Sequence, residues 1–341
     1  MSIQSVLFSK NHIAKRRNSA RNSRLSFGAM KVQAPIEVWD HILASVPSVC
    51  DDLEWSRTLR AFARTSHVSC ELAQRHLFHH ITIFTAHKRQ NVEQYIEFFV
   101  ASPHIALLVR SVEIDTVPHI PSHWCKKMVF LDLDQMPRLL SVLPQLRRLS
   151  LIAFLVNRSA TPFNFPLKNL DCLKITLSED EDEDEGFQVA PPPSATCMAV
   201  TIFRLLSLFG SVGELRLASS IYDVCACDTM PEENDSTKWF ADKYLSAVLG
   251  LHQLEIPSAL AIQALDLGSP NAPFPAFLLL KALPHTASLQ VLTSVVLLCA
   301  DPKDLDAYGE ILDLCGHQII NCEIILDAHH EWMMPTESEG E

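Results

Sequence analysis

One pattern of apolar positions recurs along most of the chain, from about Glu93 to Asp327. Each copy has an apolar stretch with helical spacing, a turn, and a strand of the form L-x-x-L-x-L, whose alternating half faces one side of a sheet. The expected strands are Val109/Val112/Ile114, Leu146/Leu149/Leu151, Leu170/Leu173/Ile175, Val212/Leu215/Leu217, Leu251/Leu254/Ile256, Leu292/Val295/Leu297 and Ile319/Cys322/Ile324. The expected helices are Tyr95–Val100, Met136–Val142, Ala199–Leu208, Trp239–Leu249, Phe277–Leu283 and Leu305–Cys315.

Helix, turn and strand in repeated order predict parallel strands, because each return to the sheet needs a crossover. Stacked copies resemble a leucine-rich-repeat arc, although their spacing varies over roughly 24 to 42 residues. The Asn or Cys typical after such a strand is replaced by Val117, Phe154, Asp180, Ser220, Ala259 and Ala300. The alternative is a doubly wound α/β domain, which predicts a Gly-rich turn at a switch point. The chain has nine glycines and no G-x-G-x-x-G motif.

Three short helices are predicted ahead of these units. An apolar stripe with spacings of three and four marks the first, which starts near Pro35 and ends at Pro47: Val38, Trp39, Ile42, Leu43 and Val46. A loop over Ser48–Arg57 is expected next. The second helix fits Leu59, Phe62 and Ala63, and the third fits Val68, Leu72, Leu77 and Phe78, with Arg75 and His76 on its outer face. Helices this short need a partner or the rest of the chain to bury their apolar faces.

The segment Pro35–Ile83 resembles an F-box, the helical module that docks a substrate receptor onto the Skp adaptor of a cullin-type ubiquitin ligase. It is similar to F-box proteins of mushroom-forming fungi, in which a helix ending in RHLF (here Arg75–Phe78) runs into a first strand with Ile81 and Ile83. It departs from the usual Leu-Pro opening at Ala34-Pro35. An N-terminal module followed by an α/β solenoid also matches the architecture of F-box proteins with leucine-rich repeats.

The resemblance implies a substrate-recognition subunit of a Skp–cullin–F-box ligase, which is not an enzyme and acts by proximity. It implies a Skp-type adaptor, a cullin and an unidentified protein substrate as partners. The residues that it assigns to the adaptor are Pro35, Ile36, Trp39, Ile42, Leu43, Leu59 and Phe62. The target would bind the arc, where polar outward strand positions are candidates that solvation explains equally well: Arg147, Arg148, Lys174, Glu214, Arg216 and Glu255.

Two other functions remain open. In the first, the chain is a non-catalytic leucine-rich-repeat scaffold whose N-terminal helices only cap the open apolar end of the arc. An exposed stripe of Ile36, Trp39 and Leu43 would favour docking, whereas burial of that stripe against the first repeat would favour the cap. In the second, the chain is an enzyme with an unrecognised active site, which requires a pocket with converging titratable groups.

The charge is unevenly distributed. The first 31 residues carry seven basic side chains and no acid, so a net charge of −12 for the whole chain leaves −19 for the rest. An acidic body argues against nucleic-acid binding, and no apolar run reaches the roughly 18 residues of a membrane span. Ten scattered cysteines favour a reducing compartment, cytoplasmic or nuclear. The basic tail fits a nuclear import signal at Lys15–Arg17, a mitochondrial transit peptide or a solvated segment.

The predicted organisation is a disordered basic tail (1–33), an F-box-like module (34–80), the repeat solenoid (81–330) and an acidic tail (331–341). The run SEDEDEDEGFQVAPPP predicts a disordered loop over 178–194 inside the solenoid. Cys225 and Cys227, with Asp223 and Asp228, lack a second ligand pair for zinc. The doublets His79-His80 and His329-His330 are expected to be partly exposed polar positions. No cofactor, metal or catalytic residue is predicted.

Overall fold

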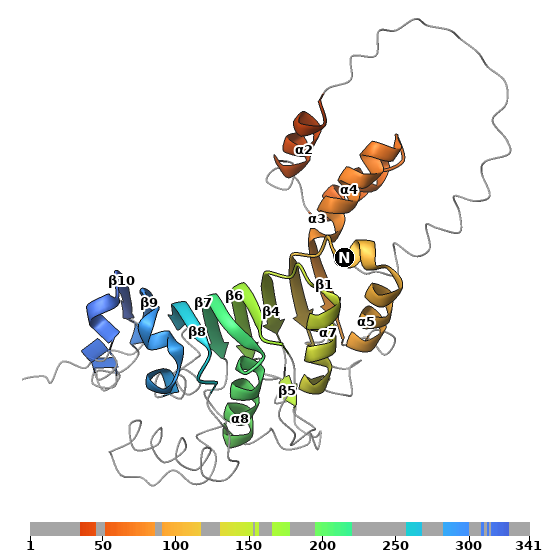
Figure 1. Cartoon of the computed structure of the whole chain (residues 1–341). Coiled ribbons are helices and arrows are strands. Elements are labelled where there is room, and N and C mark those ends of the chain that lie inside the picture. Colours follow the sequence, from red (N-terminus) through yellow and green to blue (C-terminus); the bar gives the residue numbers. More distant parts are fainter. Residues whose placement is uncertain are drawn as a thin grey trace, which may run out of the picture.

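The structure is a computed structural model that describes residues 35–45, 52–85, 91–116, 130–152, 154–156, 166–177, 195–219, 257–267, 282–299, 308–309, 312–313 and 315–326. It is a mixed α/β protein with an eight-stranded sheet, helices on one face of that sheet, and a group of N-terminal helices that projects from its end (Figure 1). Outside the described residues lie the basic and acidic tails, the acidic loop 178–194, the Cys225–Cys227 pair and the second His doublet.

All strand pairs of the large sheet are parallel, as the repeated units predict. Its strands are β1 (His80–Phe84), β2 (Ser111–Asp115), β4 (Arg148–Ile152), β6 (Lys168–Leu177), β7 (Phe209–Ser219), β8 (Ala261–Leu267), β9 (Ser294–Cys299) and β10 (Asn321–Leu326). They lie side by side in chain order, without reversal. A doubly wound domain reverses its strand order at a switch point. The described strands therefore do not support that alternative.

The apolar pattern located most strands, and its errors have local causes. The predicted strand at Leu251–Ile256 lies outside the described residues, and the strand that pairs with both β7 and β9 is β8. Its residues Ile262, Leu265 and Leu267 fit the same L-x-x-L-x-L form, so two neighbouring stretches of the sequence match the strand pattern and the later one forms the strand. Phe154, which replaces the Asn or Cys typical after such a strand, belongs to a further strand. Phe154 begins β5 (Phe154–Val156), which pairs with β3 (Phe130–Asp132) in a separate two-stranded parallel sheet.

Among the described residues before β7, the helices that follow the N-terminal group are α5 (Val92–Ala101), α6 (Pro103–Ala106), α7 (Met136–Val142) and α8 (Ala195–Leu206). The pattern predicted α5, α7 and α8. Helix α8 begins four residues before the expected start at Ala199, and the expected helix 239–249 is outside the described residues. The described end of the expected helix 277–283 runs into 3-10 turns η4 (Leu283–His285) and η5 (Ala287–Gln290) instead of a longer helix. The described part of 305–315 is helical and leads into η6 (Gly316–Gln318).

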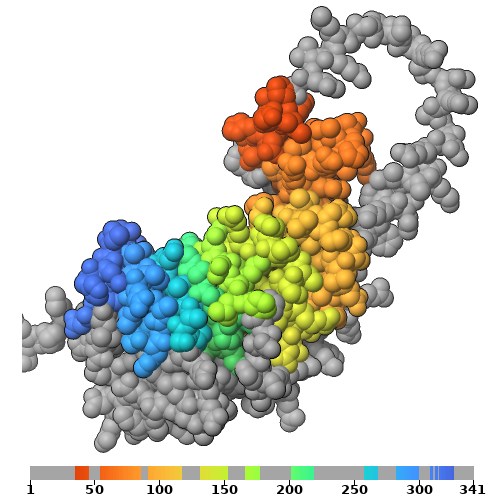
Figure 2. All heavy atoms as spheres, in the orientation of Figure 1, coloured from red at the N-terminus to blue at the C-terminus, as the bar shows by residue number. Residues whose placement is uncertain are grey.

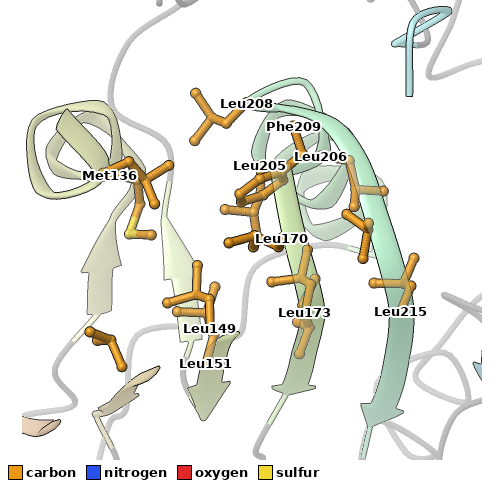
Figure 3. Close-up of a cluster of buried hydrophobic side chains, with 14 of the residues drawn as sticks. Met136, Leu149, Leu151, Leu170, Leu173, Leu205, Leu206, Leu208, Phe209 and Leu215 are labelled. Atoms are coloured by element: carbon orange, nitrogen blue, oxygen red, sulfur yellow. The ribbon is translucent and has the colours of Figure 1, made fainter. Parts of the chain in front are cut away.

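One continuous apolar core lies between the sheet and these helices. The strand register aligns a buried row across the sheet: Ile81, Val112, Leu149, Leu173, Leu215, Leu265 and Val295. Figure 3 shows how Met136 of α7 and Leu205 and Leu206 of α8 approach this row. Each fully buried Leu or Ile contributes about 1.5–3 kcal/mol relative to an exposed one. The opposite face of the sheet carries the polar positions, because side chains alternate along each strand.

The N-terminal helices are α2 (Ile36–Ser45), α3 (Asp52–Phe62) and α4 (His67–His79), close to the three predicted positions. The predicted loop 48–57 is too long, because α3 begins at Asp52. Ser66 caps α4 by accepting a hydrogen bond from the amide of Ser69 at 3.0 Å. Helix α4 ends at His79 and β1 begins at the next residue, so α2 and α3 project past the end of the sheet (Figures 1 and 2). We refer to α2, α3 and α4 as the helical module.

Candidate functional site

The helical module has a small core of its own. Leu43 of α2, Leu59 of α3, and Leu72 and Ala73 of α4 form a buried cluster that is separate from the core under the sheet. Leu77 packs against both clusters from the last turn of α4, and the next residue, Phe78, belongs to the larger one. The connection between module and sheet therefore runs through the end of α4.

Helix α2 is attached to the rest of the module at a few points besides Leu43. The Trp39 and Phe62 rings lie 5.5 Å apart between centroids, tilted by 40°. The Nε2 atom of His76 lies 3.0 Å from Oδ1 of Asp40. The His76 side chain is only 21% exposed, so its predicted place on the outer face of α4 is wrong, whereas Arg75 is exposed as predicted. His76 instead occupies the contact between α4 and α2.

An apolar surface remains exposed on α2. Ile36, Val38, Trp39 and Ile42 are exposed by 44%, 45%, 41% and 44%, and we name these four residues the α2 stripe. Five of the ten exposed large apolar residues in the described part of the chain lie in the helical module, the fifth being Val68 of α4. Scattered apolar residues are normal on a protein surface, but a concentration on one helix indicates an interaction surface.

The residues that the F-box resemblance assigns to the adaptor fall into two groups. Pro35, Ile36, Trp39 and Ile42 are exposed. Leu43 and Leu59 are 4% and 1% exposed inside the module's own core, and Phe62 is half-buried beneath Trp39. The exposed group is available to a partner. The buried group packs α2 onto the rest of the helical module. Val38 and Val68 are also exposed, by 45% and 49%, although the resemblance does not assign them to the adaptor.

The outward face of the sheet brings together five of the six candidate target-binding residues. Arg148, Lys174, Glu214 and Arg216 lie on outward strand positions, and Arg147 directly precedes β4. The positive charge of Arg216 is balanced by two carboxylates, because its guanidinium lies 2.7 Å from Oε1 of Glu214 and 3.8 Å from Oδ2 of Asp266. The sixth candidate, Glu255, lies outside the described residues.

A pocket of about 490 Å³ opens at the amino ends of β1, β2, β4 and β6, on the side from which the helical module projects. The residues that line it are His79, His80, Arg110, Ser111, Arg147, Arg148 and Asp171. His79 and His80 are exposed, as expected for this doublet. Sequence analysis had identified Arg147 and Arg148 but not their convergence with Arg110, which depends on the pairing of β2 with β4.

The pocket is electrostatically positive at His79. Partial burial lowers the pKa of His79 below its ordinary value of 6.5, and the neighbouring Arg110, His76, His80 and Arg148 lower it further. The imidazole of His80 is held on both sides: its Nδ1 lies 3.0 Å from the Ser111 hydroxyl and its Nε2 lies 3.4 Å from the Thr82 hydroxyl.

The comparisons with known proteins give no relative from which a function can be transferred. Neither protein-family models, curated proteins nor solved structures match the chain. Among the described residues, no three His, Cys, Asp or Glu side chains gather as metal ligands. None of the helices in this part of the chain is long and apolar enough to cross a membrane.

Proposed function

We propose that this chain is the substrate-recognition subunit of a Skp–cullin–F-box ubiquitin ligase, in which the α2 stripe contacts the adaptor and the sheet carries the target. The observation behind this proposal is the exposure of Ile36 and Trp39, together with that of Ile42, on a helix that projects away from the main body. Leu43, the third residue of the stripe that docking was expected to expose, is buried in the module's own core. A partner that covers such a stripe removes apolar surface from water, which stabilises the complex by about 25 cal/mol for each Å² that is buried. Tryptophan is also one of the residue types enriched at the energetic centre of interfaces.

The capping role explains less of the geometry. A cap places its apolar side on the open end of the core, and α4 already does so through Leu77 and Phe78. Helix α2 adds Leu43 to the module's own core and leaves the α2 stripe exposed. The α2 stripe is therefore not needed to close the sheet.

A leucine-rich-repeat-like solenoid is our proposal for the rest of the chain. It is supported by eight parallel strands in chain order and by helices α5, α7 and α8 on one face. In such a fold the opposite face is open along its length, which suits an extended target.

One pair of residues would favour an enzymatic function, but the third group that such a pair needs is not beside it. Ser111 and His80 are within hydrogen-bond distance at 3.0 Å, as a nucleophile and its base would be. The second nitrogen of His80 meets the hydroxyl of Thr82 rather than a carboxylate that would orient the ring and stabilise its charged form. We therefore assign this pair to the structure of the pocket and not to catalysis.

The proposal is tested by co-expressing the full chain with a Skp-type adaptor and measuring the complex by affinity purification and titration. The variant Ile36→Asp with Ile42→Asp places two charges in the α2 stripe, and we expect adaptor affinity to fall by about 30-fold or more. Both side chains are exposed in the free chain, so the melting temperature should change little.

The matched control is Val100→Asp with Leu107→Asp. These residues are exposed by 64% and 51% near α5 and α6, far along the chain from the α2 stripe. The control adds the same charge and should bind the adaptor like the unmodified chain. Equal adaptor binding by the stripe variant and this control would refute the docking surface.

A further inference from the structure

The two edges of the large sheet differ in how well they are covered. At one edge, the central residues of β1 are buried, and Ile83 is 0% exposed. At the other edge, residues 321–324 of β10 are all exposed. Ile324 is 43% exposed, and Ile320, directly before the strand, is 79% exposed. The edge at β10 is therefore open and partly apolar, and it lies at the end of the sheet opposite the helical module (Figure 1).

The backbone of β10 directs every second residue's hydrogen-bonding groups toward this edge. Among the described strands, β10 pairs with β9 only, in parallel. The amide of Asn321 donates to the carbonyl of Thr293, directly before β9, at 3.1 Å. Because backbone groups alternate in direction along a strand, Asn321 and Glu323 direct theirs toward β9, whereas Cys322 and Ile324 direct theirs to the open edge.

An open edge of this kind is a template for a further strand. Native sheets usually protect such an edge with lysine, proline or a bulge. Strand β10 has neither lysine nor proline, and its one charged residue is Glu323. Its pairing with β9 also runs without a break in register. The edge therefore lacks the features that would keep another strand away.

We propose that β10 pairs with β10 of a second copy of this chain, antiparallel and about a twofold axis at Cys322. This axis places Ile320 of one copy opposite Ile324 of the other, and Asn321 opposite Glu323. Apolar side chains then meet apolar side chains, and an amide can donate to a carboxylate. At the axis, the outward backbone groups of the two Cys322 residues face each other, so each amide can donate to the other carbonyl.

The neighbouring registers give poorer contacts. An axis at Glu323 would place two carboxylates directly opposite each other, which is destabilising. An axis at Asn321 would place Ile324 opposite Gln318, which belongs to the turn η6. An axis at Ile324 would place Glu323 opposite Ile325. The proposed axis is therefore the one that covers both exposed isoleucines and keeps like charges apart.

The dimer does not depend on the proposed function. The α2 stripe belongs to the helical module at the other end of the sheet, so pairing through β10 leaves it accessible in both copies (Figures 1 and 2). A contact made by one strand of each copy is small, and we therefore expect association in the micromolar range. The edge variants described next should bind a Skp-type adaptor as the unmodified chain does.

Sedimentation velocity of the full chain between about 1 and 100 µM tests the dimer. We expect the mass to rise from 38.2 kDa toward twice that value. Ile320→Lys with Ile324→Lys should abolish this rise, because like charges would face each other across the axis. Leu107→Lys with Leu167→Lys is the matched control, since it adds the same charge at positions that are 51% and 50% exposed outside β10. A monomer at every concentration, or equal association of the edge variant and the control, would overturn the proposal.

Substitutions at Asn321 test the register, because this side chain is exposed and would lie opposite Glu323 of the other copy. Asn321→Lys should tighten the dimer by about threefold to tenfold, and Asn321→Glu should weaken it by a similar factor. Both effects should largely disappear when Glu323→Gln is also present. Equal dissociation constants for the two Asn321 variants would rule out this pairing.

Crosslinking locates the axis. A bismaleimide with a two-carbon spacer should join the two copies through Cys322, which is exposed. Peptide mass spectrometry should identify Cys322 linked to Cys322, and Cys322→Ser should prevent that crosslink while sedimentation still shows the dimer. A dimer crosslinked through another cysteine, with no link at Cys322, would refute an axis at β10.

Discussion

At the scale of single residues, one buried hydroxyl fastens a 3-10 turn to the start of a strand. Ser288 of η5 is fully buried, and its Oγ donates to the carbonyl of Leu260 at 3.1 Å and accepts from the amide of Ile262 at 3.0 Å. These two backbone groups flank the first residue of β8. Ser288 thus supplies the hydrogen bonds that a turn this short cannot make within itself.

Ser288→Ala should therefore destabilise the chain by about 2 kcal/mol or more, because it leaves a buried donor and a buried acceptor unpaired. The measurement is the midpoint of urea denaturation followed by circular dichroism. Ser141→Ala is the matched control, since its hydroxyl donates to the carbonyl of Arg138 on an exposed turn of α7. Equal effects of the two changes would contradict this role for Ser288.

At the scale of elements, β6 and β7 approach closely where Asp171 lies opposite Gly213. Leu170 pairs with Val212 and Cys172 pairs with Glu214 in one continuous register, and the shift of register lies before them, between Lys168 and Asn169. At this point a side-chain carbon on Gly213 would lie 2.6 Å from the carbonyl oxygen of Asp171. A backbone oxygen cannot rotate away, so the glycine permits this close approach of the two strands.

We expect Gly213→Ala to push β6 and β7 apart and to cost about 1–3 kcal/mol of stability. Differential scanning calorimetry would show the loss as a lower melting temperature. Gly316→Ala serves as the control, because a side-chain carbon there meets no atom within 4 Å. A melting temperature for Gly213→Ala that matches the control would show that the strands separate at no cost.

The element scale also shows what the sequence could predict. Strands such as β4 and β7 follow from local alternation of leucines, because one face of each is buried and the other is polar. The turns η4 and η5 do not follow, since their geometry depends on partners such as Leu260 that are distant in the sequence. The sequence does not distinguish β8, with Ile262, Leu265 and Leu267, from the stretch Leu251–Ile256, because both fit the same form and only strand pairing selects between them.

At the scale of the whole molecule, the two candidate surfaces differ in how far they could be predicted. The α2 stripe follows from spacing within one helix, although the same spacing cannot tell Leu43, which is buried, from Ile42, which is exposed. That distinction depends on where α3 and α4 pack. The arginine pocket depends entirely on strand pairing, which brings Arg110 beside Arg148. A net charge of −12 gave no indication of a local positive site.

Two separate cores predict two separable openings of the molecule. Leu43 belongs only to the core of the helical module, and that module meets the sheet at the end of α4.

Leu43→Ala removes one of four buried residues from this core and should lower the stability of the helical module by about 2–5 kcal/mol. Hydrogen exchange read by mass spectrometry should then show faster exchange throughout α2, while amides of β4, β6 and β7 keep their protection. Val38→Ala, at a position 45% exposed, should leave both regions unchanged. If protection instead fell equally in α2 and in the central strands, the module and the sheet would open as one cooperative unit, and the α2 stripe could not be altered independently of the outward face of the sheet.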